Sequence, residues 1–184
     1  IITFAAKSAQ KKNIEFLTHL PDNIEYEVVG DAIRLQQIIV NILDNAIKFT
    51  EKGKVEFYVD VEIIDKLMHI NVAIHDTGKG IEPKNQKSIF QPFEQEGDAT
   101  STRDFGGTGL GLSITHNLVQ LMGGDITLQS SPGAGSVFQF NIPLGLGRRL
   151  NTEVNTKEFS TITNGHSINL SSQQQIKPGI LLAE

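Results

Sequence analysis

The fold of this chain is decided by residues 31–53, DAIRLQQIIVNILDNAIKFTEKG, which predict one long helix with two different faces. Asp31 suits the N-cap position, and Gly53 suits a stop just beyond the last turn. Successive side chains of a helix are rotated by about 100°. The apolar side chains fall on one broad arc that must pack on a core, and they are Leu35, Ile38, Ile39, Ile42, Leu43 and Ala46.

The opposite side of this helix carries Arg34, Gln37, Asn41, Asp44, Asn45 and Lys48. Asn41, Asn45 and Lys48 are spaced i, i+4, i+7, so they stack along one line of the helix. Two neutral amide oxygens suit a hard cation, and an ammonium suits anionic oxygens. A magnesium ion that is bound by both protein and phosphate oxygens needs this combination of groups. Taken alone, an ordinary solvated face explains this pattern better, and only the glycine motifs downstream shift the balance.

Composition excludes several classes of protein. With 184 residues and 39% apolar content, the chain can bury one sizeable core. The net charge of −5 argues against nucleic acid as a partner, and the absence of cysteine excludes disulfides, thiolate metal sites and a cysteine nucleophile. No apolar run approaches the roughly 20 residues of a membrane span, and no signal peptide is visible. We therefore expect a cytoplasmic fragment that does not itself contact a membrane. It would be excised from a longer parent protein, for which anchoring in a membrane stays an open alternative.

The rest of the chain alternates between helix and strand patterns. We expect a helix at 3–12, strands at 14–20 and 25–29, a hairpin of 54–64 and 67–75 turned at Asp65 and Lys66, a helix at 109–124, and a hairpin of 125–130 and 136–143. This order predicts a two-layer α/β (α+β) sandwich, with a mixed, mostly antiparallel sheet and helices on one face.

Two glycine-rich stretches lie where a ligand could approach the backbone. Residues 76–80, DTGKG, follow a strand, and Asp76 could accept a hydrogen bond from an exocyclic amine such as that of adenine. Residues 106–112, GGTGLGL, run into a helix N-terminus, where free N–H groups and the helix dipole favour phosphate. The second stretch matches neither the Walker nor the Rossmann pattern, because no Lys-Ser/Thr follows it and no strand immediately precedes it.

Together these motifs resemble the ATP-binding catalytic domain of sensor histidine kinases, within the GHKL superfamily, over residues 3–144. The matching stretches are NILDNAIKF at 41–49 (asparagine box), DTGKG at 76–80 (first glycine box), FQPF at 90–93 (phenylalanine box), GGTGLGL at 106–112 (second glycine box) and SPGAGSVF at 131–138 (closing hairpin). The resemblance implies a Bergerat-type ATP-binding fold with ATP and Mg²⁺ as its ligands.

The resemblance also implies roles for individual residues. Asn41 and Asn45 would hold Mg²⁺, while Asn41, Lys48 and Arg103 are the expected catalytic positions. The expected nucleotide-binding residues are Asn45, Phe49, Asp76, Gly78, Gly80, Ile81, Gly107, Thr108, Gly109, Leu110 and Gly111. Residues 94–108 would form an ATP lid that orders when nucleotide binds.

Asn41 separates this chain from neighbouring families of similar architecture. Gyrase-like ATPases, mismatch-repair proteins and mitochondrial-type dehydrogenase kinases carry a glutamate at this position, where a carboxylate can act as general base. An amide cannot act as a general base, so bound ATP would be hydrolysed poorly and kept for phosphoryl transfer to another group. The resemblance therefore favours a protein-histidine kinase over a gyrase-like ATPase, and a degenerate nucleotide-binding regulatory module remains an alternative.

No histidine here suits the role of phosphate acceptor. His75 ends a strand, and we expect it inside the nucleotide site. His116 lies on the second helix, where we expect it to be a helix-surface or packing residue. The expected partners are therefore a dimerisation and phosphoacceptor domain of the same parent and a receiver domain, in cis or in trans. Residues 145–177 are rich in polar residues and predict a linker, and residues 178–184, PGILLAE, resemble the first strand of a receiver domain in a hybrid kinase.

Overall fold

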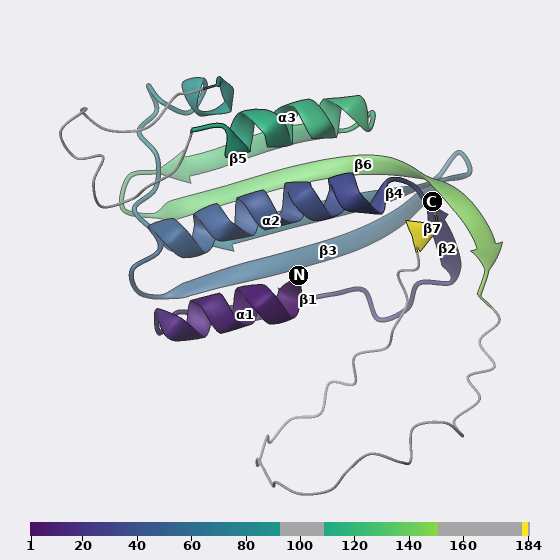
Figure 1. The fold of residues 1–184 in the computed structure, drawn as a ribbon, viewed down its shortest axis with the longest axis horizontal. Helices are drawn as coiled ribbons and strands as arrows, with labels where there is room; N and C mark the ends of the chain where they lie inside the picture. Colours follow the sequence, from purple (N-terminus) through teal and green to yellow (C-terminus); the bar gives the residue numbers. More distant parts are fainter. Residues whose placement is uncertain (93–108, 151–181, 184) are drawn as a thin grey trace, which may run out of the picture.

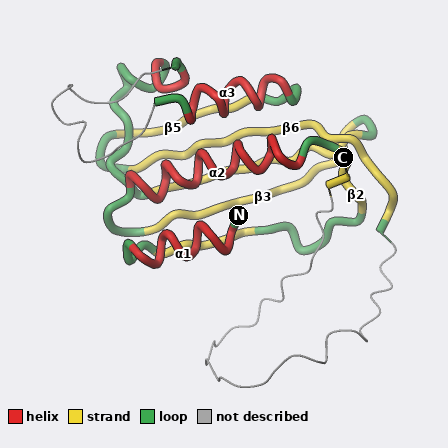
Figure 2. Tube along the Cα trace, in the orientation of Figure 1, coloured by secondary structure: helices red, strands yellow, loops and turns green. Residues whose placement is uncertain are grey.

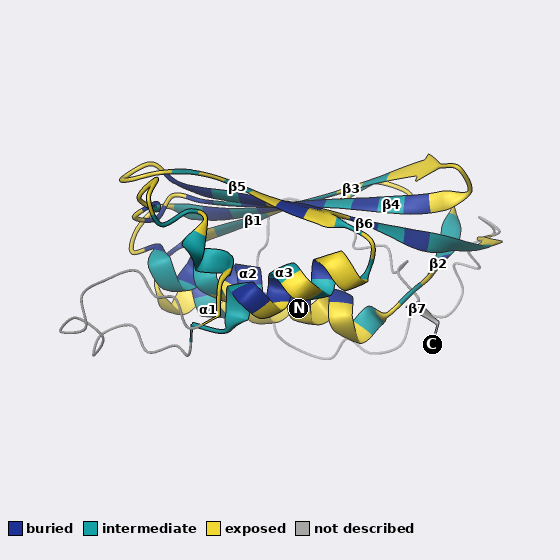
Figure 3. Ribbon diagram, turned by 90° about the horizontal axis from the view of Figure 1, so that it is seen from above, coloured by how far each residue is buried: buried dark blue, intermediate teal, exposed yellow. Residues whose placement is uncertain are grey.

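Helix α2 (Ala32–Phe49) lies across the middle of one face of a β-sheet, between helices α1 (Ile2–Lys11) and α3 (Gly111–Leu121) (Figure 1). The structure is a computed structural model, and it describes residues 1–92, 109–150 and 182–183. All three of these helices lie on the same side of the sheet (Figure 3). The described residues therefore confirm the predicted two-layer α/β sandwich.

The sheet combines both strand directions. Its strands are β1 (Glu15–His19), β2 (Tyr26–Val29), β3 (Lys54–Ile64), β4 (Leu67–Asp76), β5 (Asp125–Ser131), β6 (Gly135–Arg149) and β7 (Leu182–Ala183). They lie in the order β1-β3-β4-β6-β2-β7, and β5 also pairs with β6 (Figure 2). The β1–β3 and β2–β7 pairs are parallel and the other pairs are antiparallel, so the predicted mixed, mostly antiparallel sheet is confirmed.

The two ends of α2 are fixed by different side chains. At the start, the Asp31 carboxylate accepts a hydrogen bond from the backbone N–H of Arg34 at 3.0 Å, as an N-cap should. At the end, Thr50 turns to an extended conformation while its hydroxyl donates to the Ala46 carbonyl at 2.7 Å. The prediction that Gly53 stops the helix is wrong, because Thr50 already ends it; Gly53, at φ +109°, instead turns the chain into β3.

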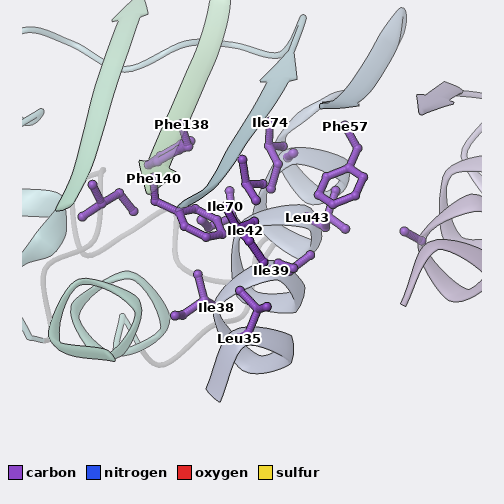
Figure 4. Close-up of a cluster of buried hydrophobic side chains, with 14 of the residues drawn as sticks. Leu35, Ile38, Ile39, Ile42, Leu43, Phe57, Ile70, Ile74, Phe138 and Phe140 are labelled. Carbon is purple, nitrogen blue, oxygen red and sulfur yellow. The ribbon is translucent and has the colours of Figure 1, made fainter. Parts of the chain in front are cut away.

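The core forms where the apolar face of α2 meets the inward side chains of β3, β4 and β6 (Figure 4). The buried residues of α2 are Leu35, Ile38, Ile39, Ile42, Leu43, Ala46 and Ile47. Opposite them, alternate residues of β4 are buried, from Met68 to Ile74. Each aliphatic side chain buried in this way contributes roughly 1.5–3 kcal/mol to folding.

The β3–β4 hairpin sets the register that the site depends on. Asp65 and Lys66 both have positive φ values, 49° and 67°, as expected for a two-residue turn whose twist matches the strands. From this turn, the pairing runs without a break from Ile64 opposite Leu67 to Val55 opposite Asp76. The hairpin therefore places Asp76 at the end of a strand whose alternate side chains face the helices.

Strand β6 continues to Arg149, although we expected a polar linker to begin at residue 145. Its last residues pair with β2, and the Arg149 guanidinium forms an ion pair with Glu25 at 2.9 Å. Gly145 and Gly147 break the hydrophobic alternation because a Cβ on either would crowd β2, which obscured the strand in the sequence. The wider division into linker and receiver start stays a prediction, because residues 151–181 and 184 lie outside the described residues.

The core predicts a sharp contrast between two isoleucines of α2. Ile42 is fully buried, and Ile42→Ala should lower the free energy of unfolding by roughly 2–5 kcal/mol, through lost burial and the cavity left behind. Ile33 is 72% exposed, so Ile33→Ala should change it by no more than about 0.5 kcal/mol. Urea denaturation of both variants measures the contrast, and equal losses would contradict the described packing of α2.

Candidate functional site

The expected site residues converge where α2 ends, beside the loop that follows β4. Residues 76–81 of this loop lie against the last turn of α2 on one side and against the β5–β6 hairpin on the other. The N-terminal end of α3 lies along the earlier turns of α2 (Figure 1). Three segments that are distant in sequence therefore surround one edge of the sandwich.

Asp76 is the one buried acidic side chain among the described residues, with 9% of its surface exposed. Its Oδ1 accepts the backbone N–H of Gly78 at 2.8 Å. Burial raises the pKa of Asp76 above its ordinary value, while hydrogen bonds from Gly78 and from the backbone and side chain of Ser136 oppose that rise. Because an ionised carboxylate can accept about four hydrogen bonds, Asp76 keeps capacity for an external donor.

Two glycines let the loop come this close to its neighbours. A Cβ on Gly78 would lie 2.5 Å from the Phe49 carbonyl oxygen, at the end of α2. Gly80 has φ +69°, and a Cβ there would collide with the Ser131 carbonyl. Larger residues at either position would push the loop, and Asp76 with it, away from α2 or from the hairpin.

A hydrogen-bond network fixes Ile81 beside this loop. The Ile81 N–H donates to Ser130 Oγ at 2.9 Å, and Ser130 Oγ donates to the Gly135 carbonyl at 2.8 Å. Gln86 Nε2 donates to the carbonyls of Ile81, at 3.0 Å, and Ser130, at 2.9 Å. Ile81 is half-buried, so it presents an apolar surface at the rim of the site.

Asn41 links α2 to α3. Its Nδ2 donates to the Gly111 carbonyl at 3.3 Å and to Thr115 Oγ1 at 3.4 Å. This commitment leaves the amide oxygen of Asn41 as the atom able to meet a cation, and the half-buried Asn45 offers a second amide one turn later. A pair of neutral oxygens fits Mg²⁺, which takes few protein ligands and shares the rest with water and phosphate. Among the described residues, no group of three or more His, Cys, Asp or Glu offers a rival metal site.

Two ammonium groups lie near the Phe49 ring. Lys48 Nζ is 4.9 Å and Lys79 Nζ is 5.1 Å from the ring centroid. This is within the range of a cation–π interaction, and it concentrates positive charge between the asparagine line and Asp76. The arrangement can bind a molecule that has a planar amine-bearing ring at one end and anionic oxygens at the other.

The structure therefore brings together most of the predicted site residues. Those on α2 are Asn41, Asn45, Lys48 and Phe49; those after β4 are Asp76, Gly78, Gly80 and Ile81; and those at the start of α3 are Gly109, Leu110 and Gly111. The whole of the predicted lid at 94–108, which includes Arg103, Gly107 and Thr108, lies outside the described residues.

Sequence reasoning missed some supporting residues and misplaced one. Ser136 donates hydrogen bonds to the Asp76 carboxyl. It could have been noticed in the sequence as a polar residue two positions before Phe138, in line with the inward-facing residues Phe138 and Phe140 of β6. Thr115, which accepts from Asn41, gave no comparable signal. The prediction that His75 lies inside the site is wrong, because strand alternation turns it to the opposite face, where its ring centroid is 4.8 Å from that of Tyr58.

Comparison with known families settles the membership of the chain. A family model described as "Histidine kinase-, DNA gyrase B-, and HSP90-like ATPase" matches residues 30–146, which include every described site residue. The chain belongs to this family. This ATPase family assignment confirms the resemblance expected from the glycine and asparagine motifs.

Relatives of this chain include histidine kinases. The chain is 44% identical over 147 residues to the signal transduction histidine-protein kinase BarA of Escherichia coli K12, and 39% identical over 157 residues to hybrid signal transduction histidine kinase A of Dictyostelium discoideum. These matches cover 79% and 80% of the chain but only 16% and 7% of the two relatives. The chain thus spans a small part of the length of the curated relatives that it matches.

Solved structures give the same result. Full-length ShkA in complex with AMPPNP matches 79% of the chain, and 29% of its own, with a TM-score of 0.66 and 31% identity. The catalytic domain of the histidine kinase ThkA matches 77% of the chain, and 90% of its own, with a TM-score of 0.58 and 30% identity.

The raised pKa of Asp76 predicts how stability depends on pH. The folded protein holds this proton more tightly than the unfolded chain, whose pKa is near the ordinary 3.8, so the ionised group costs stability at neutral pH. That cost disappears as the pH falls through the raised pKa towards 3.8. Relative to Asp76→Asn, the unsubstituted chain should therefore gain free energy of unfolding between about pH 7 and about pH 4.

Urea titrations of both proteins across this range measure the difference. Because all other titrating groups are shared, they cancel in the comparison. A difference that stays constant, or that moves against the unsubstituted chain at lower pH, would contradict the buried position of Asp76.

Proposed function

We propose that this chain is the ATP-binding catalytic module of a sensor histidine kinase. It would present Mg-ATP so that the terminal phosphoryl group passes to a histidine on a dimerisation domain outside this chain. The observation that carries the proposal is the buried, hydrogen-bonded Asp76 carboxylate beside a helix that aligns Asn41, Asn45 and Lys48. The family assignment and the names of its relatives support the same activity.

The adenine end of ATP would bind at the loop after β4. The Asp76 carboxylate would accept a hydrogen bond from the exocyclic amine, while Ile81 and Phe49 would contact the ring. The glycines at 78 and 80 keep this loop close to α2 and to the β5–β6 hairpin. A protein group that accepts a hydrogen bond from an amine, in a site from which water is largely excluded, discriminates well against ligands whose ring lacks the amine.

The phosphate end would extend along α2 towards α3. Lys48 would neutralise phosphate oxygens, and the amide oxygens of Asn41 and Asn45 would hold Mg²⁺. When bound, this ion would screen the phosphate charges and favour attack at the terminal phosphorus. The Asn41 bonds to Gly111 and Thr115 would keep its oxygen directed away from α3.

The amide at position 41 supports transfer rather than hydrolysis. Asn41 cannot take a proton from water, and it is already engaged as a donor to α3. A gyrase-like ATPase is therefore not favoured, and the relatives named above are kinases. No specific observation favours a degenerate regulatory module.

The phosphate acceptor is proposed to lie on another domain. His75 packs on Tyr58, and His116 packs on Phe90 with ring centroids 5.6 Å apart. We propose as partners a dimerisation domain of the same parent and a receiver domain, since relatives such as kinase A of Dictyostelium discoideum are named hybrid kinases.

The site of action would be the cytoplasm, where ATP is supplied. Within the described residues, no helix has the length and apolar character needed to cross a membrane.

Asp76→Asn tests the adenine site. The substitution replaces a charged acceptor oxygen with an N–H donor, so it should weaken ATP binding by about 1–3 kcal/mol. Isothermal titration calorimetry measures the affinity, with Asp60→Asn as a control, because Asp60 is an exposed acid on β3 beyond the site. Equal affinities in the unsubstituted and Asp76→Asn chains would remove Asp76 from the nucleotide site.

The fate of bound ATP tests the kinase assignment. The chain alone should bind ATP and release almost no phosphate, while adding a histidine-bearing dimerisation domain from a relative should yield acid-labile phosphohistidine on that domain. Asn41→Glu should increase hydrolysis only slightly, because the position of the attacking water matters as much as the base. Rapid hydrolysis by the unsubstituted chain would favour a gyrase-like ATPase, and phosphate on His75 or His116 would place the acceptor within this chain.

A further inference from the structure

The ammonium of Lys12 binds the end of α2 from a distant part of the chain. Lys12 Nζ donates to the backbone carbonyls of Ile47 at 2.6 Å, Lys48 at 2.9 Å and Thr50 at 2.8 Å. An ammonium has three N–H donors, and each of them meets one of these carbonyls. The contact joins residues 35 to 38 positions apart in sequence.

This contact stabilises the C-terminal end of α2. The last carbonyls of a helix have no N–H within the helix to bind, and they form the negative end of the helix dipole. A cation held against three such carbonyls opposes fraying of the last turn. That turn carries Lys48 and Phe49, two α2 residues of the proposed site.

The backbone at Lys12 is fixed by the way α1 ends. It is the C-cap residue of α1, where Asn13 adopts a left-handed conformation at φ 55° and the Ile14 N–H bonds to the Ala9 carbonyl at 3.0 Å. This pattern closes the helix and directs the chain back into the core, where Ala9 and Ile14 are buried. The ammonium is therefore presented from a fixed base.

The other side of the same turn meets the loop after β4. The Lys79 N–H donates to the Phe49 carbonyl at 3.4 Å, and Gly78 leaves no room for a Cβ beside that oxygen. The last turn of α2 is thus held between Lys12 on one side and the Asp76 loop on the other. A shift of this turn would change the distance of Phe49 and Lys48 from Asp76.

We propose that Lys12 is a positioning residue for nucleotide binding, which acts by holding the last turn of α2 so that Phe49 and Lys48 face Asp76. The inference rests on the proposed function of the site. Lys12 precedes the range 30–146 that the family model matches, so α1 contributes to the site from outside that range.

Calorimetric titration of ATP into Lys12→Met and Lys12→Arg tests the proposal. Lys12→Met keeps the aliphatic stem but removes all three donors, and it should weaken ATP binding about tenfold. Lys12→Arg retains a charge and several donors and should recover at least half of that loss on a logarithmic scale. Lys11→Met is the matched control: Lys11 is an exposed neighbour on α1, and its substitution should change affinity less than twofold.

A double-mutant cycle separates positioning from general stabilisation. If Lys12 acts through the last turn of α2, the losses caused by Lys12→Met and Phe49→Ala should be clearly less than additive. Additive losses would overturn the proposal. So would an unchanged affinity in Lys12→Met measured below its melting temperature, even if that temperature falls, because Lys12 would then act on stability alone.

The proposed function and the role of Lys12 can fail separately. If the unsubstituted chain does not bind ATP, the proposed function fails and the role of Lys12 fails with it. If the unsubstituted chain binds ATP and Lys12→Met binds it equally well, only the role of Lys12 is overturned. Circular dichroism checks that each variant is folded. If Lys12→Met does not fold, Lys12→Gln takes its place, because it removes the charge but keeps an amide donor. An affinity of Lys12→Gln equal to that of the unsubstituted chain overturns the proposal, while a severalfold weaker one supports it.

Discussion

Burial of one face of α2 on the sheet is the constraint from which the rest of the structure follows. Because Ile38, Ile42 and their neighbours must leave water, the helix can take only one rotation about its axis. That rotation turns Asn41, Asn45 and Lys48 towards the edge where α3 begins and β4 ends. The side of α2 on which the polar line lies is therefore a consequence of hydrophobic packing.

In the proposed site, stability of the fold would be exchanged for binding. A buried carboxylate is unfavourable in its ionised form, and the backbone and side chain of Ser136 compensate for it only in part. An apolar residue at position 76 would suit the core better. A dehydrated acceptor, however, distinguishes an amine-bearing ring from other planar molecules, so under the proposed function the cost to the fold would be tied to selectivity at the site.

Much of this could be predicted from sequence wherever the signal was periodic. The apolar stripe of α2, the hairpin around Asp65 and Lys66, and the glycine loop after Asp76 all follow from local rules, and the structure confirms them. Other features went unpredicted because a distant contact decides them. The glycines of β6 are packed against β2, which hid the end of that strand, and the carbonyls that bind Lys12 lie far from it in the chain. No local pattern contains such pairings.

The alternation of β4 has a consequence for how the length of this chain can change. Inward residues run from Met68 to Ile74 and end in Asp76, whereas His75 faces the other side of the sheet. Deleting or inserting one residue within β4 would exchange the two faces, exposing apolar side chains and carrying Asp76 out of the site. Insertions at the turn formed by Asp65 and Lys66 would leave this phase intact. Within the β3–β4 hairpin, we therefore expect changes of length that preserve the site to fall at the far end.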